Sequence, residues 1–496
     1  MDLLGASLSP ASGVLLLIAL ALALAFEFVN GFHDTANAVA TVIYTHSLRP
    51  GVAVVWSGLW NLIGVLTSTG AVAFGITSLL PSDLVLDIGS AAGFAMVFSL
   101  LTSAIVWNLG TWYFGIPASS SHSLIGAILG VGLANSLITS GSILNGGLNW
   151  QKAGEVGLSL LISPLAGFAL AALLLLLSKR LAPNPALFRP PDGEKAPPLW
   201  IRGILVLTCT GVSFAHGSND GQKGMGLIML ILVGIVPASY ALNAAANPRE
   251  TAAIASTVAV ARRTAEGHSA GPVLALDRNT SARALFAYAK GPASTQDPQV
   301  WPALASTLRT IEKRLLENPD LKTLSPDARK ALRGEIVVAA AALQQAEKGA
   351  SEAAQRQAFH EARTRMEALI QFIPSWVKIA VAIALGLGTT IGWKRIVVTV
   401  GEKIGKAHLS YAQGASAEMV AMATIGAADV FGLPVSTTHV LSSGVAGAMA
   451  ANRSGVQIQT IRNLFLAWVL TLPVCVTLGA LLFALALNML AAIGLN

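Results

Sequence analysis

The sequence predicts an all-α polytopic membrane protein made of two inverted repeats, with broken helices or re-entrant hairpins, about 10–12 membrane segments and a helical soluble insertion. Three observations predict this fold. First, the chain of 496 residues is 54% hydrophobic and only 11% charged, whereas soluble domains carry about 25% charged residues. Second, two polar motifs occur in the same order in both hydrophobic halves. Third, one hydrophilic stretch interrupts the second half.

The first repeated motif places ionisable side chains within apolar sequence. Residues 31–41 read GFHDTANAVAT, and residues 215–224 read AHGSNDGQKG. Aligning Asp34 with Asp220 gives an offset of 186 residues (220 − 34), which pairs His33 with Asn219 and Asn37 with Lys223. Because polar groups at membrane depth usually face a protein interior or a water-filled cavity, both motifs are candidate binding or coupling sites.

The second repeated motif has the pattern G-[IL]-P-x-S-x-[ST]-H. It occurs as GIPASSSH at residues 115–122 and as GLPVSTTH at residues 432–439, an offset of 317 (439 − 122). The two offsets differ by 131 residues, so the second half must carry an insertion of about that length between its motifs. A duplicated ancestral unit accounts for all four motifs, and paired polar interruptions of this kind indicate a transporter binding site.

These spacings predict the domain organisation. We expect a first transmembrane repeat at residues 1–180 and a linker loop at 181–200. The second transmembrane repeat should begin at 201–245, be interrupted by a soluble helical insertion at 246–372, and continue at 373–496.

The apolar segments follow one another along the chain at 11–30, 36–45, 51–76, 91–112, 117–134, 155–178, 201–214, 224–243, 375–392, 410–428, 435–451 and 463–490. A full span needs about 20 residues, and several segments, notably 36–45, 117–134 and 201–214, are shorter. Short segments beside Gly/Pro-rich polar sequence favour broken or re-entrant helices, which require cover from protein or a cavity. Pro117 and Pro434 are expected at helix starts, where the missing N–H costs nothing.

The insertion has the composition of a soluble helical segment. Ser325-Pro326-Asp327 predicts a helix start, and residues 328–371 predict an antiparallel helical pair with a break at Gly349-Ala350. Residues 270–302, rich in Gly, Pro, Ser and Asp, are expected to be loose. A peripheral cap or regulatory appendage is favoured over a separate catalytic domain, because no constellation of catalytic residues is present.

Charge and cysteine placement constrain topology and chemistry. Basic loops at 179–202 and 394–408 are expected on the cytoplasmic side, and the acidic loop 77–90 on the external side. The net charge of +7 is attributed to such loops rather than to nucleic-acid binding, since no basic stretch is interleaved with aromatic residues. Cys209 and Cys475 lie in apolar runs and are expected to be packing residues. The N-terminal apolar run lacks a basic n-region and predicts a retained first membrane helix.

The paired aspartates are candidates for the cation side of a transport site. Carboxylates at membrane depth suit a metal cation, sodium or a proton, which makes Asp34 and Asp220 candidate ligands and His33 a candidate for proton coupling. The alternative, polar helix packing only, is weakened by the symmetric positions of the two aspartates. Lys223 either counters an anion or neutralises Asp220.

The G-[IL]-P-x-S-x-[ST]-H loops are candidate anion sites. A helix N-terminus presents free N–H groups and the positive end of its dipole, and each loop adds three hydroxyls, from Ser119, Ser120 and Ser121 and from Ser436, Thr437 and Thr438. This suits a tetrahedral oxyanion such as phosphate or sulfate. The alternative is helix capping alone, but capping needs only one hydroxyl. The roles of His122 and His439 stay open between helix packing and a ligand or proton relay.

At these residues the chain resembles the PiT family of inorganic phosphate transporters, and most closely its bacterial low-affinity members. The blocks that carry the resemblance are GFHDTANAVATVIYT, WNLGTWYFGIPASSSHSLIGA, HGSNDGQKGMGLIML, VGEKIGK and GLPVSTTHVLSS. The resemblance implies inverted repeats with re-entrant hairpins and symport of phosphate with a cation. Bacterial members are understood to use protons and to accept phosphate complexed with a divalent metal.

The chain departs from the family pattern, close to A-N-D-x-A-N-A, in both signature blocks. His33 replaces the first Asn, and Gln222-Lys223 stands where Ala-Asn is usual. The loss of amide ligands argues against sodium coupling and favours a titratable mechanism.

We therefore expect a multi-pass protein of the cell inner (plasma) membrane that is not an enzyme and imports inorganic phosphate by proton symport. Asp34 and Asp220 would hold the cation, or a divalent metal (Mg, Ca or Zn) co-transported with phosphate; no tightly bound cofactor is expected. Phosphate would be held by Ser119, Ser120, Ser121, Ser436, Thr437, Thr438, Asn37, Asn219 and Lys223.

The expected partners are phosphate, protons or sodium and the lipid membrane, with a second copy of the chain as a candidate partner and no nucleic acid. Alternatives are a sulfate or other oxyanion permease, a sodium-coupled phosphate symporter, and an intramembrane hydrolase. The hydrolase is disfavoured because the adjacent Ser121 and His122 point in different directions on a helix.

Overall fold

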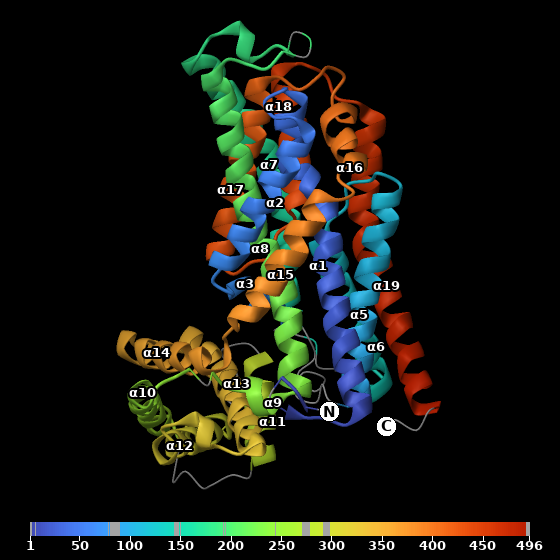
Figure 1. Cartoon of the computed structure of the whole chain (residues 1–496). Helices are drawn as coiled ribbons and strands as arrows, with labels where there is room; N and C mark the ends of the chain where they lie inside the picture. The colour runs from blue at the N-terminus through green and yellow to red at the C-terminus, as the bar shows by residue number, and fades with distance from the viewer. Residues whose placement is uncertain are drawn as a thin grey trace. The chain divides into compact units, whose positions relative to one another are not determined.

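The computed structural model describes residues 2–4, 6–77, 79, 90–142, 148, 150–191, 193, 195–243, 245–269, 278–290 and 298–492, apart from some side chains that include those of residues 35–37. The described chain is almost wholly helical (Figure 1). Two short strands, β1 (Asp2–Leu3) and β2 (Ala6–Ser7), pair antiparallel at the N-terminus. The chain divides into two compact units, one of Leu15–Ile231 with Ile373–Asn496 and one of Met1–Val14 with Leu232–Phe372.

The larger unit contains the apolar helices. Its elements in chain order are α1 (Pro10–Tyr44), α2 (Pro50–Thr67), α3 (Ala71–Thr77), α5 (Ala91–Tyr113), α6 (Ser120–Ser140), α7 (Trp150–Leu181), the short turn η1 (Pro185–Leu187), α8 (Leu199–Ile235), α15 (Ser375–Thr390), α16 (Lys394–Val398), the π-helical turn η3 (Thr399–Lys403), α17 (Tyr411–Val430), α18 (Thr437–Asn452) and α19 (Ile458–Ala492).

Seven of the described helices are long and apolar enough to cross a membrane: α1, α2, α5, α6, α7, α8 and α19. Among the other helices of this unit, α15 packs on α2, α17 packs on α3, α7 and α18, and α18 packs on α7. The predicted all-α polytopic membrane fold is therefore confirmed, while the count of 10–12 segments and the relation between the repeats stay predictions.

The helices that carry the first motif are continuous, which corrects the prediction of broken helices at these positions. Residues 31–41 lie inside α1, and residues 215–224 lie inside α8. The glycines of the motif do not break the helix. Instead, Gly31 lies where the α15 backbone at Leu385 approaches α1, and Gly217 lies where the α2 backbone at Asn61 approaches α8. Small residues allow such close helix packing in membranes.

Helix packing repeats when the two halves of the larger unit are exchanged. The contact of α6 with α19 is matched by that of α18 with α7, and the contact of α5 with α19 is matched by that of α17 with α7. In the same way, the contact of α16 with α5 is matched by that of α3 with α17. The two motif loops are held in matching ways, since Trp468 Nε1 donates to the Pro117 carbonyl and Ser159 Oγ donates to the Pro434 carbonyl, both at 3.3 Å. α1 and α8 run in opposite directions (Figure 1). This reciprocal packing supports the predicted inverted repeats.

The two basic loops lie at the same end of the larger unit, as expected if both are cytoplasmic. The turn after α18 contacts both loops: Asn452 Nδ2 donates to the Phe188 carbonyl (2.9 Å), and Gln457 Nε2 donates to the Gly405 carbonyl (2.8 Å). The loop predicted to be external, 77–90, lies almost entirely outside the described residues.

The smaller unit contains the helices of the predicted insertion. They are α10 (Pro248–Gly267), α11 (Arg278–Lys290), α12 (Val300–Glu317), the turn η2 (Leu321–Thr323), α13 (Pro326–Gly349) and α14 (Ala353–Ile370), and the short helix α9 (Pro237–Tyr240) of the same unit precedes the predicted start of the insertion at residue 246. They enclose a separate apolar core that includes Leu308, Leu343 and Phe359.

The predicted antiparallel pair is α13 and α14. Ser325 caps α13 by accepting a hydrogen bond from Ala328 N (3.2 Å), and the break lies after Gly349 as expected. The expectation that 270–302 is loose is wrong in part. α11 occupies 278–290 because it buries Leu285 and Tyr288 in this core, and α12 begins at Val300; residues 270–277 and 291–297 lie outside the described part.

Candidate functional site

All four motifs meet inside the larger unit. α1 and α8 contribute residues from their middle turns, and α6 and α18 contribute their N-terminal ends. The side chains brought together are almost completely buried: Asp34, Ser120, Ser121, Asp220, Lys223, Thr437 and Thr438. The duplicated sequence therefore converges on one place.

Two serines that the sequence assigned to anion binding act as helix caps. Ser119 Oγ accepts a hydrogen bond from His122 N (3.2 Å), and Ser436 Oγ accepts one from His439 N (3.1 Å). Each side chain satisfies one of the N–H groups that a helix start leaves without an intrahelical partner. The capping alternative thus describes Ser119 and Ser436. Pro117 and Pro434 lie two residues before these caps rather than at the first helical position.

The Asp34 carboxylate connects α1 to both helix ends. Ser120 Oγ, on α6, donates to Asp34 Oδ2 (2.9 Å), and Thr438 Oγ1, on α18, donates to Asp34 Oδ1. Ser120 Oγ also lies 3.4 Å from Asp220 Oδ2. These hydroxyls were predicted to face an anion, and the structure directs them at carboxylate oxygens.

Lys223 pairs with Asp220 and also reaches the α6 end. Its Nζ lies 2.7 Å from Asp220 Oδ1 and donates to Ser121 Oγ at 2.5 Å. Ser121 Oγ in turn donates to the Val435 carbonyl (2.7 Å) in the opposite motif loop. Of the two readings of Lys223, neutralisation of Asp220 is observed, and its position beside Ser121 keeps the ammonium at the helix end.

Two histidines border the carboxylates. His33 lies between Asp34 and α5, with Nδ1 3.4 Å from Asp34 Oδ1 and Nε2 3.1 Å from Thr111 Oγ1. His216 Nε2 lies 3.9 Å from Asp34 Oδ2 and 3.5 Å from Asp220 Oδ2. Its other ring nitrogen is 3.0 Å from Asn61 Oδ1 on α2.

Sequence reasoning did not select His216 as a site residue. The repeated pattern is centred on Asp34 and Asp220, whereas His216 lies near the start of the second motif. The signal was nevertheless present. His216 precedes Asp220 by four residues, one helical turn, so both side chains share a face of α8. At the same offset of 186 residues, His216 aligns with Asn30, a buried polar residue of α1.

Asp34, His216 and Asp220 offer a donor set for a metal ion. One ligand atom from each residue lies within 4.8 Å of the others, and all three side chains are buried. Carboxylate oxygens and an imidazole nitrogen fit a borderline or hard divalent cation. The set extends the predicted pair Asp34 and Asp220 by one nitrogen ligand.

Thr437 Oγ1 is buried and has no hydrogen-bond partner among the described residues, and the same holds for Asn219 Oδ1. Asn219 Nδ2 donates to the Leu433 carbonyl (3.2 Å), which ties α8 to the α18 loop. Asn37 lies in α1, but its side chain falls outside the described part of the chain.

His122 and His439 lie beside each other behind the caps, with ring centroids 4.4 Å apart, and His439 stacks on Trp468 at 4.2 Å. His122 Nδ1 is 2.9 Å from Ser119 Oγ. These contacts favour the packing reading for both rings.

Comparison with known proteins identifies the family. The phosphate transporter family matches residues 30–479, which include all four motifs. The chain belongs to this phosphate transporter family. It is 43% identical to the low-affinity inorganic phosphate transporter PitA of Escherichia coli (strain K12), over 97% of this chain and 98% of that protein. It is 41% identical to PitB of the same strain, over 97% and 98%.

A solved structure, "The sodium-dependent phosphate transporter", has the same fold, with a TM-score of 0.52 and 18% identity over 95% of this chain and 98% of that chain. Family membership confirms the predicted resemblance and makes the chain a phosphate transporter, not an enzyme. Together with the seven candidate spans found among the described helices, it also confirms a multi-pass protein of the plasma membrane. The candidate site of this phosphate transporter is a duplicated polar cluster buried between helices.

Proposed function

We propose that this transporter imports inorganic phosphate by proton symport, and that phosphate and the coupling proton meet at the buried cluster of Asp34, Asp220, His33, His216 and Lys223. The observation that carries the proposal is the contact between the two motif pairs. One hydroxyl, Ser120 Oγ, lies 2.9 Å from the carboxylate of α1 and 3.4 Å from that of α8. The helix ends proposed to bind the anion therefore lie beside the titratable groups.

The anion side is supplied by the starts of α6 and α18. Because Ser119 and Ser436 already cap these helices, Ser120, Ser121, Thr437 and Thr438 are not needed as caps. The backbone N–H groups of the first turns and the positive dipole ends favour an anion. We propose that phosphate oxygens take hydrogen bonds from these hydroxyls and from Lys223, with Asn37 and Asn219 at the periphery.

The proton side follows from the charge of the cluster. With both imidazoles neutral, Asp34, Asp220 and Lys223 sum to −1 (−2 + 1), which repels phosphate. Protonation of His33 and His216 changes the sum to +1 (−1 + 2), which attracts it. Proton binding would therefore prepare the site for the anion, and loss of the protons would favour its release.

Co-transport of a metal–phosphate complex is a second form of the same proposal, favoured by the donor set of Asp34, His216 and Asp220. A divalent cation in the cargo would supply the positive charge that the imidazoles otherwise supply. Lys223 would have to leave Asp220 for this carboxylate to bind the cation, because the two are paired at 2.7 Å.

Uptake into proteoliposomes tests these forms separately. Labelled phosphate uptake should increase when an inward proton gradient is imposed in buffers without sodium or divalent metal. Stimulation by magnesium alone, with stoichiometric metal uptake, would favour the complex. Stimulation by a sodium gradient alone would contradict proton symport and support the sodium-coupled alternative.

Substrate choice needs its own measurement, because hydroxyl-rich helix ends also suit sulfate. Family membership favours phosphate, and relatives named as low-affinity inorganic phosphate transporters support weak binding. Excess sulfate should leave labelled phosphate uptake unchanged. Inhibition by equimolar sulfate would indicate a general oxyanion permease. Association with a second copy of the chain stays a prediction.

A further inference from the structure

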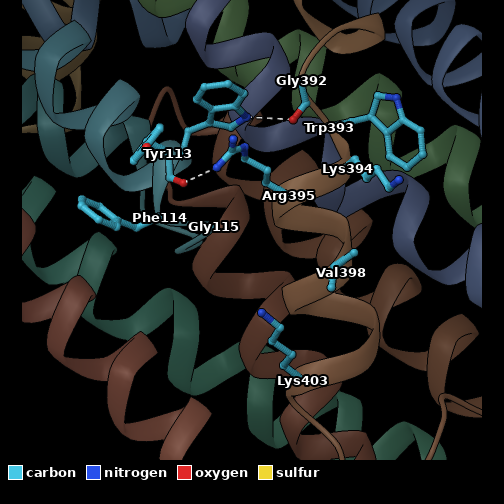
Figure 2. Close-up of a pocket in the computed structure, with 10 residues that line it drawn as sticks. Tyr113, Phe114, Gly115, Gly392, Trp393, Lys394, Arg395, Val398 and Lys403 are labelled. Carbon is cyan, nitrogen blue, oxygen red and sulfur yellow. Dashed lines mark hydrogen bonds between the residues drawn. The ribbon is translucent and has the colours of Figure 1, made fainter.

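A second basic site lies outside the buried cluster, in the basic segment 394–408. It is a cavity of about 630 Å³ between the end of α5 and the segment from Gly392 to Lys403. Its lining includes Arg395, Lys394 and Lys403, with the aromatic residues Trp112, Tyr113, Phe114 and Trp393 (Figure 2). None of these residues belongs to the proposed transport site.

Arg395 is fixed in place by the α5 end. Its Nη1 donates to the Tyr113 carbonyl (2.6 Å), and its guanidinium lies 5.1 Å from the centroids of both the Trp112 and Tyr113 rings. Trp112 Nε1 donates to the Gly392 carbonyl (2.8 Å), which is a second hydrogen bond between the end of α5 and the segment from Gly392 to Lys403 (Figure 2). A stacked, prealigned guanidinium is suited to binding phosphate oxygens.

Lys394 and Lys403 add two exposed ammonium groups to the lining, and within the described chain neither makes an ion pair with a carboxylate. Tyr113 and Phe114 are 61% and 74% exposed beside them. Exposed aromatic residues next to lysine and arginine are typical of the membrane interface, where anionic headgroups are concentrated.

The position that matches this cavity in the internal repeat has no cluster of basic residues, so the cavity is not a feature that the duplication produced twice. Phe431, the counterpart of Phe114 at the offset of 317, is also exposed, at 76%. The loop after it packs on α3, with Gly432 close to Ala71, and α3 reads AVAFGIT without a charged residue. The basic residues are therefore a specific addition to one end of the molecule.

We propose that this cavity binds an anionic phosphate group at the cytoplasmic surface, presented by a phospholipid headgroup or by free inorganic phosphate. Arg395 provides the fixed donor, and Lys394 and Lys403 provide the neutralising charge. The occupant lies next to the loop that leads to the α6 end, because Thr399 Oγ1, from the same segment, donates to the Gly115 carbonyl (2.7 Å).

The test compares three forms of the full-length protein: wild type, Lys394→Gln with Lys403→Gln, and the control Lys406→Gln, which removes an exposed charge nearby that does not line the cavity. Arg395 is kept because it holds the α5 end. Binding of labelled phosphatidylglycerol and of labelled inorganic phosphate is measured on delipidated, detergent-purified protein, with thermal melting to establish folding.

We expect the double variant to lose affinity for phosphatidylglycerol roughly ten-fold relative to wild type and control. Loss of one class of inorganic phosphate sites instead, with lipid binding and the uptake KM unchanged, would support the same site and identify free phosphate as the occupant. Unchanged binding of both probes in a folded double variant would overturn the proposal.

Discussion

At the scale of single residues, Asp34 on α1 contacts the other three helices of the buried cluster. It accepts hydrogen bonds from Ser120 and Thr438 and lies within 3.9 Å of His216. Asp34→Asn keeps the shape of the side chain and removes its charge, so we expect uptake to be abolished while the amount of protein in the membrane is unchanged. Labelled phosphate uptake and immunoblotting measure the two effects.

The control for Asp34→Asn is Asp320→Asn, because Asp320 caps a turn of the insertion, where asparagine caps as well. It should transport at the wild-type rate. Wild-type uptake by Asp34→Asn would mean that the first motif is structural, and the coupling carboxylate would then have to be Asp220.

His33 and His216 lead to a second prediction at this scale. If proton binding at the cluster makes the site attractive to phosphate, uptake at a fixed concentration of one phosphate species should rise as pH falls, because each bound proton adds one positive charge to the site. His33→Asn, which restores the commoner family residue, should flatten this profile. His216→Gln should also change the profile, since His216 approaches both carboxylates.

His360→Asn serves as the control for the pH profile, because His360 is an exposed residue of the insertion paired with Glu347. Its profile should match wild type. Profiles that superimpose for wild type, His33→Asn and His216→Gln would remove both imidazoles from coupling.

Much of the site could be predicted because its residues are repeated. The duplication predicted that Asp34, Asp220 and the hydroxyls after Pro117 and Pro434 would converge, and they do. It could not predict which hydroxyl caps a helix and which one contacts a carboxylate. Ser119 and Ser120 are adjacent and chemically identical, yet one caps α6 and the other donates to Asp34. That division depends on where the helix begins, which is set by tertiary packing.

At the scale of elements, the division between capping and site hydroxyls leads to a third prediction. Ser120→Ala with Thr437→Ala should raise the uptake KM several-fold at unchanged expression, at about 0.5–1.5 kcal/mol per neutral hydrogen bond. Ser119→Ala with Ser436→Ala should instead lower thermal stability, at about 0.5–2 kcal/mol per cap. Kinetics and melting of the purified variants measure both; the reverse pattern would show that Ser120 and Thr437 only support the helices.

The glycine contacts of α1 lead to a fourth prediction. A Cβ on Gly31 would lie 2.9 Å from Thr389 N of α15, in addition to its contact with the Leu385 carbonyl. Gly31→Ala should therefore separate the helices at a cost of about 1–3 kcal/mol, measured as a lower melting temperature. Gly110→Ala is the matched control, because open space surrounds Gly110 in α5 and alanine favours the helix. Equal melting temperatures for both variants would contradict this packing role.

The same contacts explain why helix breaks were predicted at the wrong places. Glycine among polar residues is an ordinary signal of a helix break. The sequence alone does not say whether a glycine ends a helix or leaves room for the backbone of a neighbouring helix. The glycine in α1 leaves room for the backbone of α15, the glycine in α8 leaves room for the backbone of α2, and both helices continue through the motifs.

At the scale of the whole molecule, the reciprocal packing leads to a fifth prediction, that the two halves are inverted in the membrane. Phe114 and Phe431 are matched by the offset of 317 and are both exposed. Phe114→Cys should react with a membrane-impermeant maleimide from the cytoplasmic side only, and Phe431→Cys from the external side only. The native Cys209 and Cys475 are buried and give little background.

Labelling of intact cells and of inside-out vesicles separates the two sides. Reaction of both cysteines from one side would show that the repeats are parallel.

The hydrophobic pattern predicted the membrane helices well, because their apolar runs are long. The insertion was only partly predictable, since α10, α11 and α12 are held by contacts with each other and with α13 and α14 rather than by strong local signals.

The hydrogen bonds within the cluster also set the strength with which cargo can be held. Ser120, Ser121, Thr438 and Lys223 already bind Asp34, Asp220 and the Val435 carbonyl. In the proposed mode of binding, phosphate oxygens exchange with these internal partners, so the net gain per new bond would be only the difference between two good interactions. Such partner exchange would keep the free energy of occupancy small and let the proposed cargo dissociate quickly.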